Sequence, residues 1–164
     1  MIIKKKINKE EHNIEFVSSK KFEIYLRKKI TNKDILIIDK NLTSNVSINK
    51  IYKDFSNRCF LINGNEGIKS LKTFNVLIEK ILKIGIQRDS KLISIGGGTV
   101  GDLSGYIASS LLRGINHIMV PTTLLAMVDS SIGGKTGINS DYGKNLIGSF
   151  YLPEKVLICT DFLS

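Results

Sequence analysis

The sequence has 164 residues, enough for one domain with a sizeable core, and its 42% hydrophobic and 24% charged content is ordinary for a folded globular protein. The formal net charge is +9, and the lysines are spread over the first half of the chain rather than set in one run. Because few aromatic side chains lie between these lysines, the charge indicates a solvated basic surface or a small anionic substrate, and argues against nucleic-acid binding.

Strand and helix patterns alternate along the first 120 residues. Residues 1–18 alternate weakly between apolar and polar side chains, which predicts one or two strands at a sheet edge. Apolar runs typical of parallel strands covered on both faces occur at 35–38, 59–62 and 92–95, and a fourth strand is predicted at 117–120. Apolar residues at helical spacing predict helices at 21–30, 48–55 and 71–85, with Ser70 and Gly85 at the ends of the last. This alternation predicts an α/β fold, a Rossmann-like parallel sheet with flanking helices.

Polar residues follow the first two of these strand runs. Asp39-Lys40-Asn41 comes after 35–38, and Asn63-Gly64-Asn65-Glu66-Gly67-Ile68-Lys69 comes after 59–62. Ligands of α/β sheets bind at the carboxyl ends of the strands, so both segments are candidate contacts. For Asp39 and Asn41, a plain turn after a strand is an open alternative.

Glycine is dense from residue 95 to residue 150, where it is interleaved with apolar side chains. Gly96-Gly97-Gly98-Thr99-Val100-Gly101 fits G-x-G-x-x-G between a strand and a helix-like run at 102–112, so its backbone N–H groups could face a pyrophosphate. A standard Rossmann unit carries an acid about 20 residues later, but the chain reads Met119-Val120-Pro121-Thr122 there. If a dinucleotide binds, Asp39 is the best-placed residue for its ribose.

Several polar residues of this stretch have two interpretations. Asp102 could cap the following helix or contact a ligand, and Arg113 could satisfy carbonyl groups at the helix end or bind a phosphate. Thr123 could cap a short helix at 124–128 or line a ligand site. His117 is interpreted as a strand residue rather than a metal ligand, and with His12 remote the chain is a poor source for a His-rich zinc site.

The densest polar set of the chain lies in DSSIGGKTGIN and GKN, and consists of Asp129, Lys135, Lys144 and Asn145. Two lysines between glycines suit an anionic ligand that is held by point charges and backbone donors. We prefer this interpretation to a solvated loop because apolar residues are interleaved regularly with the polar ones.

The two cysteines, Cys59 and Cys159, lie far apart in apolar strand-like runs without a CxxC pattern. Such cysteines indicate buried thiols in a reducing compartment. The N-terminus has no apolar segment long enough for a signal peptide, and no apolar run approaches the roughly 20 residues that span a bilayer. We therefore expect a cytoplasmic protein without a membrane partner.

Four segments resemble the 3-dehydroquinate synthase family: GGGTVGDLSGYIA, LLRG, VPTTLLAMVDSSIGGKTGIN and GKNLIGSFYLP. The resemblance is dense from 92 to 163 and thin before 35. Thr99 and Tyr106 differ from the residues usual in the family, but neither difference removes a chemical group. It implies NAD-dependent conversion of a seven-carbon keto-acid phosphate (DAHP) into 3-dehydroquinate with loss of phosphate, in the shikimate pathway. It also implies a divalent metal, usually zinc, and a homodimer.

The resemblance further implies a role for each matching residue. Asp39 and Asn41 would hold the adenosine ribose side of NAD, and Arg113 would reach the substrate phosphate across a dimer interface. The implied catalytic set is Asp129, Lys135, Lys144, Asn145 and Arg113. The implied cofactor contacts are Asp39, Asn41, Gly64, Asn65, Glu66, Gly67, Ile68, Lys69, Gly97, Gly98, Thr99, Val100, Gly101, Asp102, Thr122, Thr123, Lys135, Lys144 and Phe162.

The length of the chain departs from this family. Its members are longer and carry a mainly helical second half, which supplies the metal ligands, a Glu and two His. We therefore expect residues 1–164 to form an NAD-binding N-terminal domain that has no metal site and no complete turnover by itself. A related sugar-phosphate cyclase and a non-catalytic NAD-binding or dimerisation remnant remain as alternatives.

Overall fold

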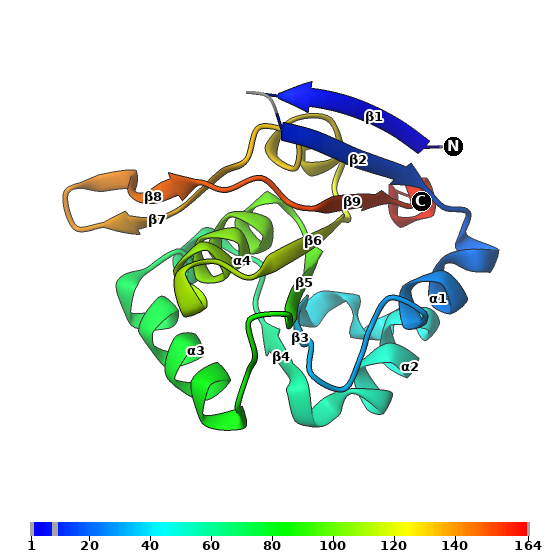
Figure 1. Cartoon of the computed structure of the whole chain (residues 1–164), viewed down its shortest axis with the longest axis horizontal. Coiled ribbons are helices and arrows are strands. Elements are labelled where there is room, and N and C mark those ends of the chain that lie inside the picture. Colours follow the sequence, from blue (N-terminus) through cyan, green and yellow to red (C-terminus); the bar gives the residue numbers. More distant parts are fainter. Residues whose placement is uncertain (1, 8–9, 164) are drawn as a thin grey trace.

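A computed structural model describes residues 2–7 and 10–163. Within them, a seven-stranded sheet has the strand order β1-β2-β9-β6-β5-β3-β4, and β7 and β8 form a separate two-stranded hairpin (Figure 1). The strands are β1 Ile2–Ile7, β2 Glu10–Phe16, β3 Ile35–Asp39, β4 Cys59–Ile62, β5 Lys91–Gly96, β6 Asn116–Pro121, β7 Lys135–Ser140, β8 Gly143–Phe150 and β9 Lys155–Ile158. The six strands from β2 to β4 are parallel, and β1 is antiparallel to β2 at one edge.

Helices cover both faces of the sheet, so the predicted α/β fold is confirmed. The α-helices are α1 Ser19–Arg27, α2 Val46–Asp54, α3 Leu71–Ile84 and α4 Gly98–Ser110. In β3, Leu36 and Ile38 pack in the cluster that includes residues of α1 and α2, whereas Ile35 and Ile37 pack in the cluster that includes residues of α3 and α4. Successive side chains of a strand point to opposite faces, which explains the continuous apolar run. Each fully buried Ile or Leu contributes about 1.5–3 kcal/mol relative to an exposed one.

Helix α4 begins earlier than the sequence predicts. It starts at Gly98 instead of Asp102, so Asp102 lies in its second turn and is not its cap. A Cβ at Gly101 would lie 2.1 Å from Met119 Cε, and one at Gly105 would lie 2.3 Å from Thr136 Cγ2. The glycines thus allow α4 to lie directly against β6 and β7.

The chain between β6 and β9 differs from the prediction in part. The expected short helix at 124–128 is present: residues 124–125 are α-helical and continue into a π-helical turn, η5 Ala126–Ser130. Thr123 Oγ1 accepts a hydrogen bond from the Ala126 N–H (3.3 Å) at its start. The polar set in DSSIGGKTGIN and GKN was not predicted to form strands, yet most of it lies on the β7–β8 hairpin. The other short helical turns are η1 Lys40–Ser44, η2 Ser56–Arg58, η3 Glu66–Ile68, η4 Leu111–Arg113 and η6 Thr160–Leu163.

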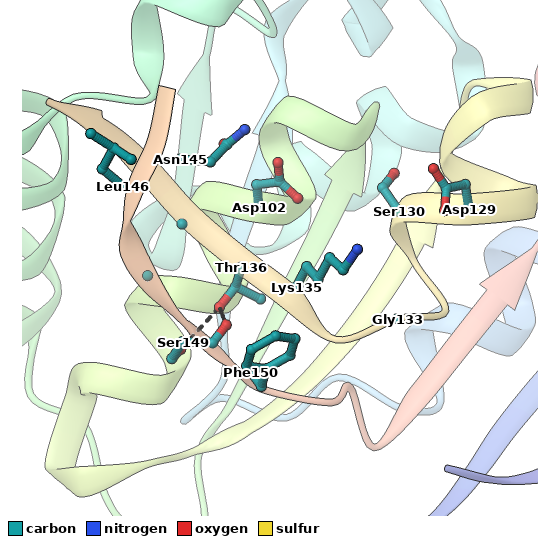
Figure 2. A pocket seen from close by; sticks show the side chains of 12 residues that line it. Asp102, Asp129, Ser130, Gly133, Lys135, Thr136, Asn145, Leu146, Ser149 and Phe150 are labelled. Carbon is teal, nitrogen blue, oxygen red and sulfur yellow. Dashed lines mark hydrogen bonds between the residues drawn. The ribbon is translucent and has the colours of Figure 1, made fainter. Parts of the chain in front are cut away.

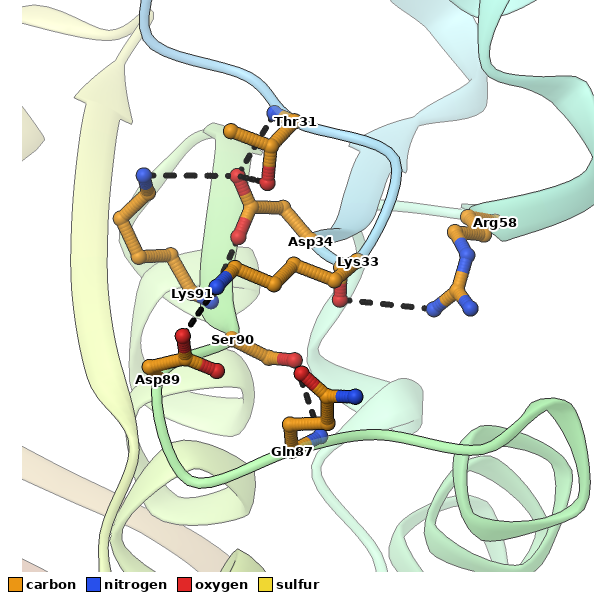
Figure 3. A network of polar contacts seen from close by, with 8 residues as sticks. All are labelled: Thr31, Lys33, Asp34, Arg58, Gln87, Asp89, Ser90 and Lys91. Atoms are coloured by element: carbon orange, nitrogen blue, oxygen red, sulfur yellow. Dashed lines mark hydrogen bonds and ion pairs between the residues drawn. The ribbon is translucent and has the colours of Figure 1, made fainter.

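The amino ends of β3 and β5 are joined by a polar network around Asp34 (Figure 3). Asp34 is fully buried and accepts hydrogen bonds from the Thr31 N–H, the Thr31 hydroxyl and the Lys91 N–H, each at 2.8 Å. The Lys91 ammonium lies 3.4 Å from the same carboxylate. These donors and the ammonium satisfy the buried carboxylate, which would otherwise be costly to bury. This network anchors the sheet at the end opposite to the predicted ligand site.

Both cysteines are free thiols. Cys159 is buried, as predicted, whereas Cys59 is partly exposed on β4. Burial raises the pKa of the Cys59 thiol to about 12 and also raises the pKa of Cys159. In the part of the chain that the structure describes, no helix is long and apolar enough to cross a membrane.

Candidate functional site

The carboxyl ends of four neighbouring parallel strands bring most of the predicted cofactor contacts to one edge of the sheet. β4, β3, β5 and β6 pair in this order, and each is followed by one of the predicted segments. Asp39 and Asn41 follow β3, and residues 64–69 follow β4. Residues 97–102 follow β5, while Thr122 and Thr123 follow β6. The prediction that the two early segments lie at the carboxyl edge is confirmed.

Asp39 has a structural role in the turn after β3. Its Oδ1 accepts hydrogen bonds from the Asn41 N–H (3.0 Å) and from the Gly64 N–H (3.3 Å), so it caps η1 and ties it to the segment after β4. A Cβ at Gly64 would lie 2.0 Å from Asp39 Oδ2, which explains the glycine there. The turn interpretation of Asp39 is therefore confirmed, and its contact with a ribose stays a prediction.

The glycine-rich turn after β5 lies directly against the segment after β6. A Cβ at Gly98 would lie 2.8 Å from Ser130 Oγ, and one at Gly97 would lie 3.2 Å from Thr123 Cγ2. Gly97 occupies the N-cap position of α4, and no side chain forms a capping hydrogen bond there. The first-turn N–H groups of α4 are thus available to an anion. Ser130 Oγ is buried without a hydrogen-bond partner among the described residues.

A buried lysine connects three of the predicted site segments. Lys69 is 4% exposed, and its Nζ donates to Asp102 Oδ2 (2.8 Å) and to Asn145 Oδ1. Glu66 Oε1 lies 3.9 Å from the same ammonium. Burial raises the pKa of Asp102, and the hydrogen bond and charge of Lys69 oppose this shift only in part. Lys69 therefore keeps a partly desolvated carboxylate in place.

A cavity of about 500 Å³ lies between α4, η5 and the β7–β8 hairpin (Figure 2). In Figure 2 the Lys135 side chain extends between Asp102 on one side and Ser130 and Asp129 on the other. The cavity is lined by Asp102, Asp129, Ser130, Gly133, Lys135, Thr136, Gly137, Asn145, Leu146, Gly148, Ser149 and Phe150. The structure thus gathers Asp102, Asp129, Lys135 and Asn145, which the sequence placed in a site. Carboxylates and ammonium groups in one cavity can bind a polar ligand and move protons.

Three further predicted residues lie outside both this cavity and the segments that follow β3, β4, β5 and β6. Lys144 is exposed on β8, and Arg113 is exposed at the end of α4, where its φ is 69°. Phe162 packs edge-on against Phe22 with ring centroids 5.1 Å apart, in the core beneath α1. Their ligand contacts stay predictions.

His117 is a buried strand residue, as predicted. Its Nε2 lies 2.8 Å from Ser94 Oγ, and burial lowers its pKa to about 4. Within residues 2–7 and 10–163, no group of three His, Cys, Asp or Glu side chains could hold a metal ion.

Sequence reasoning missed three hydroxyl residues that line the cavity. They are Ser130, Thr136 and Ser149. Ser130 directly follows Asp129, so its sequence position was a usable signal. The Thr136 hydroxyl donates to the Ser149 carbonyl oxygen (2.9 Å) across the hairpin, a contact that no sequence pattern indicates.

Fold and site together define an α/β protein with a candidate ligand site at the carboxyl edge of a parallel sheet, beside a glycine-rich helix start. A family model described as 3-dehydroquinate synthase N-terminal matches residues 59–164. The chain therefore belongs to the 3-dehydroquinate synthase family, as its sequence motifs indicate.

Individual relatives match two thirds or more of the chain, but the chain spans less than half of their own length. The 3-dehydroquinate synthase of Pelagibacter ubique is 43% identical over 167 residues, which cover 99% of this chain and 41% of that protein. The 3-dehydroquinate synthase of Pyrococcus furiosus is 51% identical over 111 residues, covering 68% of this chain and 33% of that protein. A crystal structure of 2-deoxy-scyllo-inosose synthase, complexed with carbaglucose-6-phosphate, NAD+ and Co2+, matches 99% of this chain and 46% of that one, with a TM-score of 0.83 and 26% identity.

Proposed function

We propose that this chain is the NAD-binding part of a 3-dehydroquinate synthase, the lyase that converts DAHP into 3-dehydroquinate with loss of phosphate. The observation that carries the proposal is the position of Asp102. It follows the glycine-rich turn on α4 and also lines the 500 Å³ cavity. Asp102 thereby connects the turn that would hold the pyrophosphate of NAD with Asp129 and Lys135, which would lie near its reactive end.

The residues at the turn fit NAD. Gly97 and Gly98 let the turn lie close to Thr123 and Ser130, because a Cβ at either position would collide with those side chains. The buried Ser130 hydroxyl has no partner of its own in the described structure, so a ligand can supply one. When bound, NAD supplies the acceptor for a hydride. Asp39 and Glu66 are proposed to hold its ribose groups, with Lys69 placing Asp102.

The remaining polar groups of the cavity suit an anionic sugar phosphate. Lys135 is proposed to bind a substrate anion, and Asp129, across the cavity, to accept or donate a proton there. Lys144, next to Asn145, and Arg113, proposed to act across a homodimer interface, would add positive charge. Binding of an anionic sugar phosphate is consistent with the net charge of +9, and we prefer it to nucleic-acid binding.

A divalent metal does not fit the residues that the structure describes, because they contain no suitable group of ligands. The chain also spans only 41% of its Pelagibacter relative. We therefore propose that metal binding and complete turnover need residues beyond those of this sequence. The free thiols fit a reducing compartment such as the cytoplasm.

Calorimetry with NAD, followed by an assay with DAHP, NAD and Zn2+, tests the proposal. We expect the 164-residue chain to bind NAD and to form no dehydroquinate. A chain that does not bind NAD would contradict the cofactor role, and robust turnover would contradict the proposed incompleteness. Fusion to the remaining part of the Pelagibacter relative should restore turnover. Intact NAD binding without restored turnover would instead favour a non-catalytic remnant.

A related sugar-phosphate cyclase is a second candidate, because a 2-deoxy-scyllo-inosose synthase matches 99% of the chain with a TM-score of 0.83. The same fusion protein discriminates between the two candidates. A 3-dehydroquinate synthase should act on DAHP, whereas that cyclase type should act on a hexose phosphate and leave DAHP unchanged.

A further inference from the structure

Asn139 lies on β7 at an irregularity of the hairpin. β7 and β8 pair in register up to Ile138 and Ile147, and the register shifts before Ser140 pairs with Gly143. The Asn139 N–H instead donates to the Lys69 carbonyl oxygen (2.8 Å), and Ser70 and Asn139 form an isolated parallel bridge. The irregularity therefore joins the hairpin to the segment that follows β4.

The Asn139 side chain makes two further hydrogen bonds. Its Nδ2 donates to Glu66 Oε1 (2.8 Å), and its Oδ1 accepts from the Asn145 N–H (2.9 Å). A carboxylate accepts and a backbone N–H donates, so these partners determine the orientation of the amide. An aspartate or an alanine at this position cannot make both contacts.

Both side-chain partners of Asn139 are neighbours of the Lys69 ammonium. Asn145 has a φ of 57°, a left-handed conformation, and its Oδ1 accepts from Lys69 Nζ. Glu66 Oε1 lies 3.9 Å from the same ammonium. Asparagine adopts the left-handed conformation more readily than most non-glycine residues, and the hydrogen bond to the Asn145 N–H holds the backbone there.

We propose that Asn139 is a positioning residue of the cofactor site: it holds Glu66 and Asn145 around Lys69 and fixes the hairpin against the segment after β4. The inference rests on the proposed roles of Glu66 in holding NAD and of Lys69 in placing Asp102. Asn139 touches neither the Lys69 ammonium nor the 500 Å³ cavity, and acts through its two partners.

The test compares the 164-residue chain with Asn139→Ala and with Ser140→Ala as a matched control. Ser140 Oγ accepts from the Tyr142 N–H (3.2 Å) in the same hairpin, so its loss disturbs the turn but none of the contacts of Asn139. A second variant, Asn139→Asp, keeps an acceptor for the Asn145 N–H and places a carboxylate against Glu66. Asn139→Asp keeps the proposal testable if Asn139→Ala does not fold.

NMR of the ligand-free chains is the first readout. We expect Asn139→Ala to shift the Asn145 amide and the Lys69 ammonium resonances, Asn139→Asp to shift chiefly the ammonium, and Ser140→Ala to shift neither. Calorimetry with NAD is the second readout. Asn139→Ala should weaken binding about tenfold, the loss typical of a hydrogen bond to a charged group, and Ser140→Ala should not weaken it.

Unshifted Lys69 resonances in both Asn139 variants would overturn the positioning role, whether or not NAD binds. If a variant with shifted resonances bound NAD as tightly as the wild-type chain, the role of Asn139 in the cofactor site would be overturned. If the wild-type chain bound no NAD while the resonances shifted, the proposed function would fail and the positioning of Lys69 would stand.

Discussion

Replacing Lys69 by Met removes the partner of a partly buried carboxylate. Lys69 Nζ lies 2.8 Å from Asp102 Oδ2, and the two side chains are 4% and 24% exposed. Breaking a fully buried ion pair costs about 3–5 kcal/mol, because one charge stays buried without its partner. Since water still reaches Asp102 and screens its charge, we expect Lys69→Met to lower the free energy of unfolding by about 2 kcal/mol at pH 8.

The loss should depend on pH. Burial already raises the pKa of Asp102 in the wild-type chain, and removing Lys69 raises it further. A carboxyl group with a raised pKa in the folded state binds its proton more tightly when folded, so its stabilising effect is present at low pH and is lost as the pH rises through that pKa. The deficit of Lys69→Met against wild type should therefore be smaller at pH 4 than at pH 8.

Urea unfolding followed by circular dichroism at both pH values measures these differences. The double variant Lys69→Met/Asp102→Asn should recover most of the loss at pH 8, because no unpaired charge remains. Lys72→Met, an exposed lysine on α3, is the matched control and should change stability little. An equal deficit at both pH values, or no recovery in the double variant, would refute the charge argument.

Three further predictions concern buried polar groups. Ser130→Ala should weaken NAD binding about fivefold, as expected for one hydrogen bond, while Ser131→Ala, also a buried hydroxyl without a partner among the described residues, should leave the affinity measured by calorimetry unchanged. Burial lowers the pKa of His117 to about 4, so the folded state favours the neutral ring. The free energy of unfolding should therefore fall as the pH drops from the unfolded-state pKa of about 6.5 toward 4. In His117→Gln, the free energy measured by urea unfolding should depend less on pH over this range. Because the pKa of Cys59 is about 12, its thiol should react slowly with a disulfide reagent at pH 8 and fast in urea, and equal rates would contradict its burial.

The inner strands β3, β5 and β6 could be predicted because burial on both faces favours apolar residues at successive positions. β3 shows this, since its residues 35–38 are fully buried between the two helical layers. The β7–β8 hairpin could not be predicted in this way. Most side chains of β8 are exposed, and glycines replace apolar residues where the strands approach closely. A Cβ at Gly148 would lie 2.2 Å from the Thr136 carbonyl oxygen.

The members of the candidate site could be predicted, but not their mutual contacts. Glu66, Lys69, Asp102 and Asn145 each stand in a motif that indicates a ligand. Lys69 nevertheless meets Asp102 and Asn145 across 33 and 76 residues of sequence, and only the packing of α4 and the hairpin brings them together. The start of α4 was predicted four residues too late because glycines at 98 and 101 resemble a loop, whereas here they allow close packing.

The two ends of the same parallel strands are built differently. At the amino ends of β3 and β5, the buried Asp34 receives three hydrogen bonds and an ion pair from the chain itself. At the carboxyl ends, Ser130 has a buried hydroxyl without a partner in the described structure, α4 has no side-chain cap, and Asn145 holds a left-handed backbone. Unsatisfied polar groups and backbone strain cost stability, and the chain could avoid them with the devices that it uses around Asp34. A polar ligand bound at the carboxyl ends would complete these contacts, as the proposed NAD site requires.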